Sequence, residues 1–338
     1  MINYGKQTLE PSDFKSVFKT LKAPFLTSGP KVKQFEKELL NKFGGNFCSV
    51  VNNGTAALYI LGKALGWKQG DNIITTPLSF LATANCITNN NANPDFADIE
   101  NETFTIDPQK LEDKLEKKNY KAVIAVDYAG HPCDWKSLNF LSKKYKFILI
   151  NDACHSMGSK IDNNFKYATY YSDFVTHSYH PVKAITTGEG GSIISKNKKI
   201  AKRIEQIRNN SMLPTKKDGP WYYETHEPGF NFRITDFQCA LGISQLKKLE
   251  KFITARRKIA SLYIKELGND DRFIVPTEKK NYYHSYHLFP LQVDFRKIKI
   301  SKKELFKRFK RKGINLQVHY IPLHLQPYYK KKFNFKKK

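Results

Sequence analysis

The chain has 338 residues, and its 57 basic and 31 acidic side chains give it a net charge of +26. Hydrophobic residues make up 40% of it and aromatic residues 13%, which is enough for a large core and excludes a wholly disordered protein. No apolar stretch is long enough to cross a membrane, and the N-terminal MINYGKQTLE lacks the apolar segment of a signal peptide.

The five cysteines are scattered along the chain and include no CxxC pair. An odd and scattered set of thiols is typical of a reducing compartment, and it argues against a disulfide framework or a zinc site. We therefore expect a cytoplasmic protein that holds no metal and has no membrane partner.

The positive charge is concentrated at the C-terminal end. Residues 296–338 contain sixteen Lys or Arg and one acid, Glu304, so they carry +15 of the +26. Arg is the residue best suited to bidentate recognition of bases and phosphates, but only nine of the 57 basic residues are Arg. No helix-turn-helix, RRM or zinc-finger pattern accompanies them. We interpret the charge as a Lys-rich surface without a nucleic acid partner. A regulatory or nucleic-acid-binding protein is the non-enzymatic alternative.

The first 200 residues alternate between helical and strand patterns. Apolar residues recur on one face of a helix at 31–43, and a short buried strand at 47–51 leads into a helix at 52–66. This alternation predicts an α/β domain with a mostly parallel sheet, whose ligand site lies beyond the carboxyl ends of the strands. The further elements predicted here are strands at 72–77, 122–130, 146–155 and 173–180 and a helix at 137–145.

The pattern changes after residue 235. A long helix at 236–267 is predicted to lead from a large domain, residues 1–240, to a small one, residues 241–338. The small domain is predicted to contain a strand at 284–295, a helix at 302–313, a strand at 315–323 and a low-complexity Lys-rich end at 330–338.

Lys183 is the first candidate for chemistry. It lies in HSYHPVKAITTGEGG (177–191), among apolar and small residues, just after a strand and before a Gly-rich turn. A desolvated lysine has a lowered pKa and can act as a nucleophile that forms a Schiff base. Taken alone, a lysine before a turn is more typical of a solvated surface.

Three other segments complete a pattern. Asp152 ends the apolar strand FILIND and could hold a pyridinium N–H, although an acid before a turn is also a common helix N-cap. Gly54 and Thr55 begin a helix after a strand, where free N–H groups bind anions. Phe80 follows a strand and could stack on a flat ring, or simply join the core. Together with Lys183 they provide the parts of a pyridoxal phosphate site.

These residues lie in motifs that resemble the DegT/DnrJ/EryC1/StrS family of sugar aminotransferases. The resemblance runs from residue 26 to residue 329 and includes NNGTAAL, TTPLSFLATAN, NDACHSMGS, HSYHPVKAITTGEGG and GFNFRITDFQCALGISQL. It implies the fold type I, aspartate aminotransferase-like architecture, with a large α/β/α domain and a small C-terminal α+β domain. Relatives continue for several dozen residues beyond VHYIPLHLQPYY (318–329), so we expect this small domain to be shortened.

The resemblance also assigns roles to individual residues. Lys183 matches the lysine that binds pyridoxal 5′-phosphate and moves the proton, and Asp152 matches the acid at the pyridine nitrogen. His155 matches a residue packed near the ring, and Ser178 matches a phosphate contact beside Gly54 and Thr55.

Asn231 matches an asparagine that reaches the cofactor phosphate of the neighbouring subunit, which implies a homodimer with shared active sites. Five residues match segments that line the sugar-nucleotide pocket in the family: Tyr4, Leu26, Thr27, His319 and Tyr320. His177 and His180 are as consistent with packing as with catalysis. Asp173 and Glu189 are consistent with bracing of loops, and Arg233 and Asp236 are expected to fix the Asn231 loop rather than to bind substrate.

The segments VDYAGHP, GPWYYE and VHYIPLHLQPYY are most similar to family members that aminate C4 of a UDP-linked 4-keto-6-deoxy-N-acetyl-hexosamine for pseudaminic acid. The resemblance thus implies a UDP-linked keto sugar and L-glutamate as substrates. One alternative is a different nucleotide-keto-sugar. Another is a dehydratase of the same family, in which a His replaces the Schiff-base lysine, and Lys183 argues against it.

Overall fold

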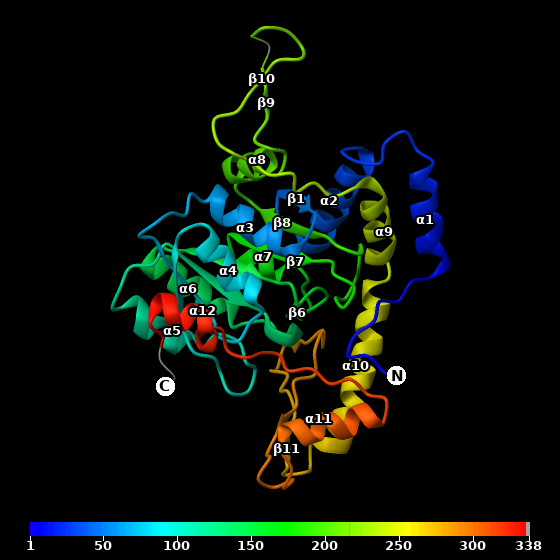
Figure 1. Cartoon of the computed structure of the whole chain (residues 1–338), viewed down its shortest axis with the longest axis vertical. Helices are drawn as coiled ribbons and strands as arrows, with labels where there is room; N and C mark the ends of the chain where they lie inside the picture. Colours follow the sequence, from blue (N-terminus) through cyan, green and yellow to red (C-terminus); the bar gives the residue numbers. More distant parts are fainter. Residues whose placement is uncertain (216, 336–338) are drawn as a thin grey trace.

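A computed structural model describes residues 1–215 and 217–335 of the chain, so the predicted Lys-rich end is described only as far as residue 335. Its centre is a seven-stranded sheet with strands in the order β1-β8-β7-β5-β4-β2-β3 (Figure 1). β8 is antiparallel to its neighbours β1 and β7, and the other pairs are parallel, which confirms the predicted mostly parallel sheet. The strands are β1 (Phe47–Val51), β2 (Asn72–Thr75), β3 (Asn93–Phe96), β4 (Ala122–Val126), β5 (Ile148–Asp152), β7 (Phe174–Ser178) and β8 (Gly191–Ser195).

Helices follow most of the strands, as predicted for 31–43, 52–66 and 137–145. Sequence reasoning did not predict α1, α4, α5, α7, α8 or α12. The helices are α1 (Pro11–Leu21), α2 (Pro30–Phe43), α3 (Gly54–Ala64), α4 (Leu81–Asn89), α5 (Pro108–Leu115), α6 (Trp135–Tyr145), α7 (Tyr167–Tyr171), α8 (Lys198–Ile207), α9 (Asp236–Leu246), α10 (Leu249–Leu267), α11 (Lys302–Arg311) and α12 (Pro327–Phe333). In the part of the chain that is described, no helix is long and apolar enough to span a bilayer.

The two faces of the sheet are covered by different helices. Successive strand residues point to opposite faces, so Val123 and Leu149 pack with α2 and α6, whereas Ile124 and Ile150 pack with α3 and α4. Burial on both faces explains why β4 is apolar throughout. Helices therefore cover both faces of the sheet, and polar side chains are left to the ends of the strands.

The predicted helix 236–267 is interrupted. α9 ends at Leu246, and Lys247 and Lys248 form a turn before α10 begins at Leu249. The turn places Ile253 of α10 against Gly158, where an added Cβ would come within 2.6 Å of its side chain. The prediction of one continuous helix was therefore wrong at the turn of Lys247 and Lys248. The chain bends there, which buries the first turns of α10 against the loop after β5.

Most of the predicted strand 284–295 is not a strand. Only Gln292–Val293 (β13) is one, and it pairs with β11 (Phe273–Ile274). Further back, Tyr286 has a φ of +46° and its N–H donates to His284 Nδ1 at 2.8 Å, which turns the chain out of the extended conformation. The predicted strand at 284–295 was therefore wrong except at Gln292–Val293.

The predicted strand 315–323 is also wrong. Its backbone bonds to loops and to one side chain instead of to a strand. Asn315 N–H donates to Ile2 O at 2.9 Å, the Tyr128 hydroxyl donates to His319 O, and Leu323 N–H donates to Pro77 O at 2.8 Å. The segment therefore crosses the large sheet's carboxyl edge as an irregular strap.

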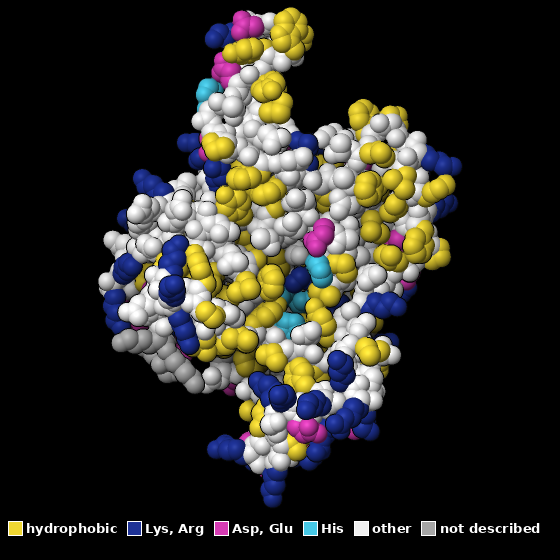
Figure 2. Space-filling model, viewed as in Figure 1, with side chains coloured by type: hydrophobic (Ala, Val, Ile, Leu, Met, Phe, Trp, Pro, Cys, Tyr) yellow, Lys and Arg dark blue, Asp and Glu magenta, His cyan; other side chains and the backbone are white. Residues whose placement is uncertain are grey.

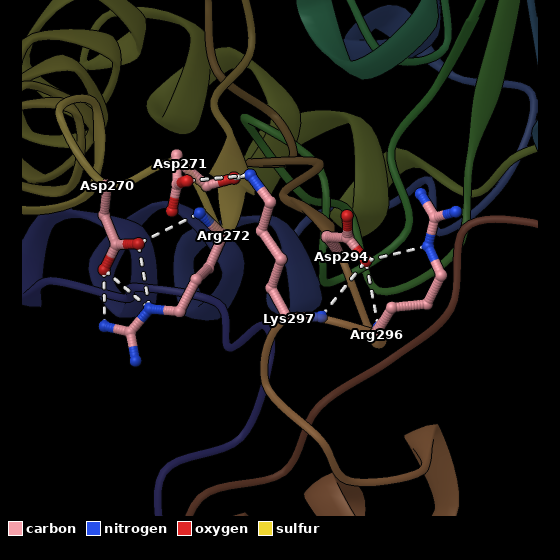
Figure 3. Close-up of polar contacts among 6 residues, drawn as sticks. All are labelled: Asp270, Asp271, Arg272, Asp294, Arg296 and Lys297. Carbon is pink, nitrogen blue, oxygen red and sulfur yellow. Dashed lines mark hydrogen bonds and ion pairs between the residues drawn. The ribbon is translucent and has the colours of Figure 1, made fainter.

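Acidic and basic side chains gather where the chain leaves α10 (Figure 3). Asp270 pairs with Arg272, Asp271 with Lys297 and Asp294 with Arg296. Most of these side chains are partly or largely exposed, so each pair contributes little to stability. The β11–β13 pairing and its backbone hydrogen bonds are the more substantial link in this region.

Candidate active site

A cavity of about 1120 Å³ opens at the carboxyl edge of the sheet. Figure 2 shows it as a hollow at the centre of one face, with basic and histidine side chains inside. The structure brings ten of the thirteen predicted site residues to its wall. They are Tyr4, Gly54, Thr55, Phe80, Asp152, His155, Ser178, Lys183, His319 and Tyr320.

Lys183 lies on a turn after β7. Its backbone N–H donates to His180 O at 2.8 Å, which closes the turn and places the side chain at the cavity. Burial lowers the pKa of its amine, although Cys154 and the carboxylate of Asp152 act in the opposite direction. A lysine with a lowered pKa is more often neutral near pH 7, and so available as a nucleophile or base.

Asp152 ends β5, and its side chain is 4% exposed. Thr83 Oγ1 of α4 donates to Asp152 Oδ2 at 2.7 Å, and the Cys154 N–H donates to Oδ1 at 3.2 Å. Ser79 and Thr83 hydroxyls are 2.8 Å apart, so Ser79 donates to Thr83 and completes a short relay. The carboxylate is thus fixed in one orientation and keeps lone pairs for a ligand in the cavity.

The N-terminus of α3 provides an anion site. The Asn53 side chain accepts the Ala56 N–H at 2.7 Å, whereas the N–H groups of Gly54 and Thr55 have no hydrogen-bond partner among the described residues. Ser178, at the end of β7, lies directly opposite. An added Cβ on Gly54 would come within 2.8 Å of Ser178 Cβ, so only glycine permits this approach.

His155 and Tyr320 form the opposite wall. The Ala129 N–H donates to His155 Nδ1, and His155 Nε2 lies 3.3 Å from the Tyr320 hydroxyl. Burial and the nearby charge of Lys183 hold the pKa of His155 well below its usual range, so its ring is neutral. A neutral ring that accepts at Nδ1 carries its proton on Nε2, which donates to Tyr320. The Tyr320 proton is then free to point at a ligand.

Aromatic rings line the entrance. The rings of Phe80 and Tyr320 are 6.1 Å apart, and Phe80 is 53% exposed at the start of α4. The ring of Tyr4 lies 5.4 Å from that of His319. These rings offer flat apolar surfaces on which a planar ligand can stack.

The other three predicted residues do not line the cavity. Thr27 pairs with Thr235, and Leu26 O accepts the Asp236 N–H at 2.9 Å, which places both on an exposed loop beside α9. Asn231 is exposed, between two phenylalanines that do line the cavity. Within one chain these three residues are therefore not part of the wall around Lys183.

The structure gives different positions to the two histidines, His177 and His180, whose role the sequence left open between packing and catalysis. His177 is buried against Phe43, with ring centroids 5.2 Å apart, and its Nδ1 lies 3.2 Å from Ser192 Oγ, so it packs in the core. His180 lines the cavity at its rim, as does Glu189.

Of the residues expected to brace loops, Arg233 acts beside Asn231 as predicted, whereas Asp236 holds the start of α2 instead of the Asn231 loop. Asp173 accepts the Leu149 N–H, and Asp236 accepts the N–H groups of Gly29 and Lys31. Arg233 donates to Asn209, whose backbone pairs with Asn231.

Sequence reasoning missed Thr83 and His287. Thr83 is three residues beyond Phe80 in TTPLSFLATAN, so helical spacing from a suspected site residue was an available signal. The ring of His287 lies 4.5 Å from that of His155. It is more than 100 residues away in the sequence, in a segment predicted as a strand, and nothing local marks it. In the described ranges, no group of three His, Cys, Asp or Glu side chains could hold a metal ion.

A buried lysine, a carboxylate at a strand end and a helix N-terminus facing one cavity define an enzyme site at the carboxyl edge of an α/β sheet. Comparison with known proteins agrees. The model of the DegT/DnrJ/EryC1/StrS aminotransferase family matches residues 7–338. The chain belongs to this family of aminotransferases and has the fold type I architecture of its members.

Individual relatives are similar over nearly the whole chain. The UDP-4-amino-4,6-dideoxy-N-acetyl-beta-L-altrosamine transaminase of Campylobacter jejuni is 38% identical over 333 residues, which cover 98% of this chain and 86% of that protein. The spore coat polysaccharide biosynthesis protein SpsC of Bacillus subtilis is 34% identical over 346 residues, with 98% and 86% covered.

Among solved structures, Helicobacter pylori PseC, an aminotransferase involved in the biosynthesis of pseudoaminic acid, superimposes with a TM-score of 0.91. Its sequence identity is 30%, and the match covers 99% of this chain and 89% of that one.

The buried core histidine gives a pH-dependent stability. Burial lowers the pKa of His177 to about 4, so the unfolded chain binds a proton that the folded chain does not. The free energy of unfolding should therefore fall as the pH drops from about 6.5, the ordinary value of His, to about 4. His177→Asn should flatten this slope in urea titrations. The exposed control His226→Asn should leave the slope unchanged, and an unaltered slope in His177→Asn would contradict the assignment.

Proposed function

We propose that this aminotransferase uses pyridoxal 5′-phosphate to move an amino group from L-glutamate to C4 of a UDP-linked 4-keto-6-deoxy-N-acetyl-hexosamine, in the formation of pseudaminic acid. The observation that carries the proposal is the convergence of Lys183, Asp152 and the free N-terminus of α3 on one cavity. The transaminase from Campylobacter jejuni, which is named for a UDP-linked 4-amino sugar, supports the substrate.

The cavity residues fit this cofactor. The N–H groups of Gly54 and Thr55 and the Ser178 hydroxyl would hold the phosphate, because they are donors without other partners in the described chain. The carboxylate of Asp152 would hold the pyridine nitrogen, and Lys183 Nζ would bind the aldehyde carbon covalently. The bound cofactor supplies an electron sink that stabilises negative charge on the carbon from which a proton is removed.

The remaining chemistry belongs to the chain's own side chains. Lys183 Nζ is free to act as a base once the amine of glutamate has displaced it from the cofactor. With its lowered pKa it would then take the proton from the carbon that carries the amino group of glutamate, and return one to C4 of the sugar. The Tyr320 hydroxyl, with its proton free, can donate to a sugar oxygen. Phe80, on the cavity wall and 53% exposed, offers a flat apolar face on which the planar cofactor ring could stack.

A second copy of the chain would complete the site. Asn231 is exposed beside the cavity rather than within it, so it is suited to reach a phosphate in a neighbouring subunit. An apolar surface on α1 and the loop after it supports self-association, with Phe14 and Phe18 60% exposed and Phe25 56% exposed. Leu26 and Thr27 extend this surface and would face the partner's sugar pocket.

Replacing Lys183 tests the enzyme proposal. The purified protein should absorb visible light as a lysine-bound pyridoxal phosphate does, and borohydride should fix the cofactor to the peptide that contains Lys183. Lys183→Ala should lose this attachment and at least about 1000-fold in kcat, because the base and the covalent anchor are both removed. Lys160→Ala, a lysine remote from the cavity lining, is the matched control. Turnover and absorbance that survive in Lys183→Ala would contradict the proposal.

Mixing two inactive variants tests the shared site. Lys183→Ala and Asn231→Asp should each be inactive alone, the second because a carboxylate repels the phosphate. After unfolding and refolding together in equal amounts, half of the dimers are mixed, and each has one intact site. Activity should return to about a quarter of that of the wild type. Activity that stays at the level of the separate variants would show that Asn231 serves its own subunit or none.

A further inference from the structure

One arginine of α10 joins two distant segments of the cavity wall. Arg256 Nη2 donates to the carbonyls of Val182 and Lys183, both at 3.4 Å, and Arg256 Nη1 donates to the carbonyl of His287 at 3.3 Å. Lys183 and His287 both line the cavity but lie more than 100 residues apart in the sequence. A single guanidinium therefore bridges the two segments.

The partners of Arg256 are carbonyl oxygens rather than acids. The ion pairs found among residues 1–215 and 217–335 include the adjacent Arg257 with Glu278, at 2.6 Å, but none that involves Arg256. Arg257 also donates to His284 O and stacks 4.0 Å over the ring of Tyr283. The two neighbours thus differ. The charge of Arg257 is neutralised by Glu278, whereas Arg256 has no acidic partner among the described residues and keeps its positive charge beside the cavity.

The backbone at Lys183 depends on contacts from outside. The turn belongs to no helix or strand. Its internal hydrogen bonds run from Lys183 N–H to His180 O at 2.8 Å and from Val182 N–H to His180 Nδ1 at 3.5 Å. Gly5 packs against Val182 on one side, where an added Cβ would be 3.1 Å from Val182 Cγ1. On the side of α10, the guanidinium of Arg256 holds the carbonyls, and a planar group with five donors is suited to several acceptors at once.

We propose that Arg256 is a positioning residue for the reaction: it fixes the peptide of Lys183 against the segment of His287 and places a positive charge near the lysine amine. This inference rests on the proposed function only in the role given to Lys183. Misplacement of a reacting group by about 1 Å can cost roughly 100-fold in rate, so a brace at this position affects turnover.

The effect of the Arg256 charge on the pKa of Lys183 has a direction that can be measured. Arg256 lowers the pKa of Lys183 and adds to the effect of burial, whereas Cys154 and Asp152 raise it. Three histidines complete the surroundings of the amine, and burial lowers the pKa of each: His155, His287 and His319. Because these rings are neutral near pH 7, Arg256 is the cation that acts on Lys183.

The test uses the cofactor-free protein and does not depend on turnover. The rate at which acetic anhydride labels Lys183 is followed against pH by peptide mass spectrometry, since only the neutral amine reacts. Arg256→Met should move the labelling profile of Lys183 to higher pH, because a nearby positive charge is lost. Arg257→Met, next to it on α10 and equal in size, should leave the profile where it is.

A second variant separates charge from geometry. Arg256→Lys keeps the charge, so its labelling profile should stay close to that of the wild type. It replaces the two separate donor nitrogens Nη1 and Nη2 with one, and so loses the fork that reaches His287 O and Lys183 O together. Its kcat should still fall roughly 10- to 100-fold, with a smaller change in the KM for glutamate. It also provides a folded variant if Arg256→Met is unstable.

An unmoved profile in Arg256→Met, an equal shift in Arg257→Met, or a wild-type kcat in Arg256→Lys would overturn the inference. Failure of the proposed function would appear elsewhere, as a wild-type protein in which borohydride attaches no cofactor to Lys183.

Discussion

The site depends on the carboxylate of Asp152 being held at the end of the central strand β5. Thr83 fixes one of its oxygens at 2.7 Å, and the backbone of Cys154 fixes the other. Because β5 and β7 are parallel, their last residues, Asp152 and Ser178, meet at the same edge of the sheet, where the α3 N-terminus also arrives. Without that alignment, the acid, the anion site and the lysine turn would not face a common ligand.

Much of this arrangement could be predicted from the sequence, because the relevant signals are local. Short strands alternating with helices indicate a parallel sheet, and the apolar run that ends in Asp152 marks its functional edge, whereas the role of Ser178 came only from the family resemblance. Gly54 and Thr55, where a strand turns into an apolar helix, mark an anion site. Lys183 is recognisable because it interrupts an apolar and small-residue segment. Each of these rests on neighbours within a few positions, which is the range over which sequence patterns are informative.

The rest could not be predicted, because it depends on residues that meet only in the folded chain. Residues 284–295 were predicted as a strand, but contacts with α10 and with the loop after β4 decide their path. Arg256 and His287 carry no local mark of their role. The net charge of +26 was also no guide: within the described residues, Lys183 is the only Lys or Arg on the cavity wall. The basic groups that dominate the composition, such as those of α11 and α12, are exposed instead.

The central claim is that this cavity moves an amino group to C4 of a nucleotide-linked keto sugar. The most direct test incubates the cofactor-loaded protein with L-glutamate and a panel of UDP-linked 4-keto- and 3-keto-6-deoxy sugars of both configurations, with products identified by mass spectrometry and NMR. The account predicts one molecule of 2-oxoglutarate for each molecule of amino sugar, with nitrogen on C4. An amino group on C3, or no amino sugar from any 4-keto substrate while the cofactor stays on Lys183, would contradict it.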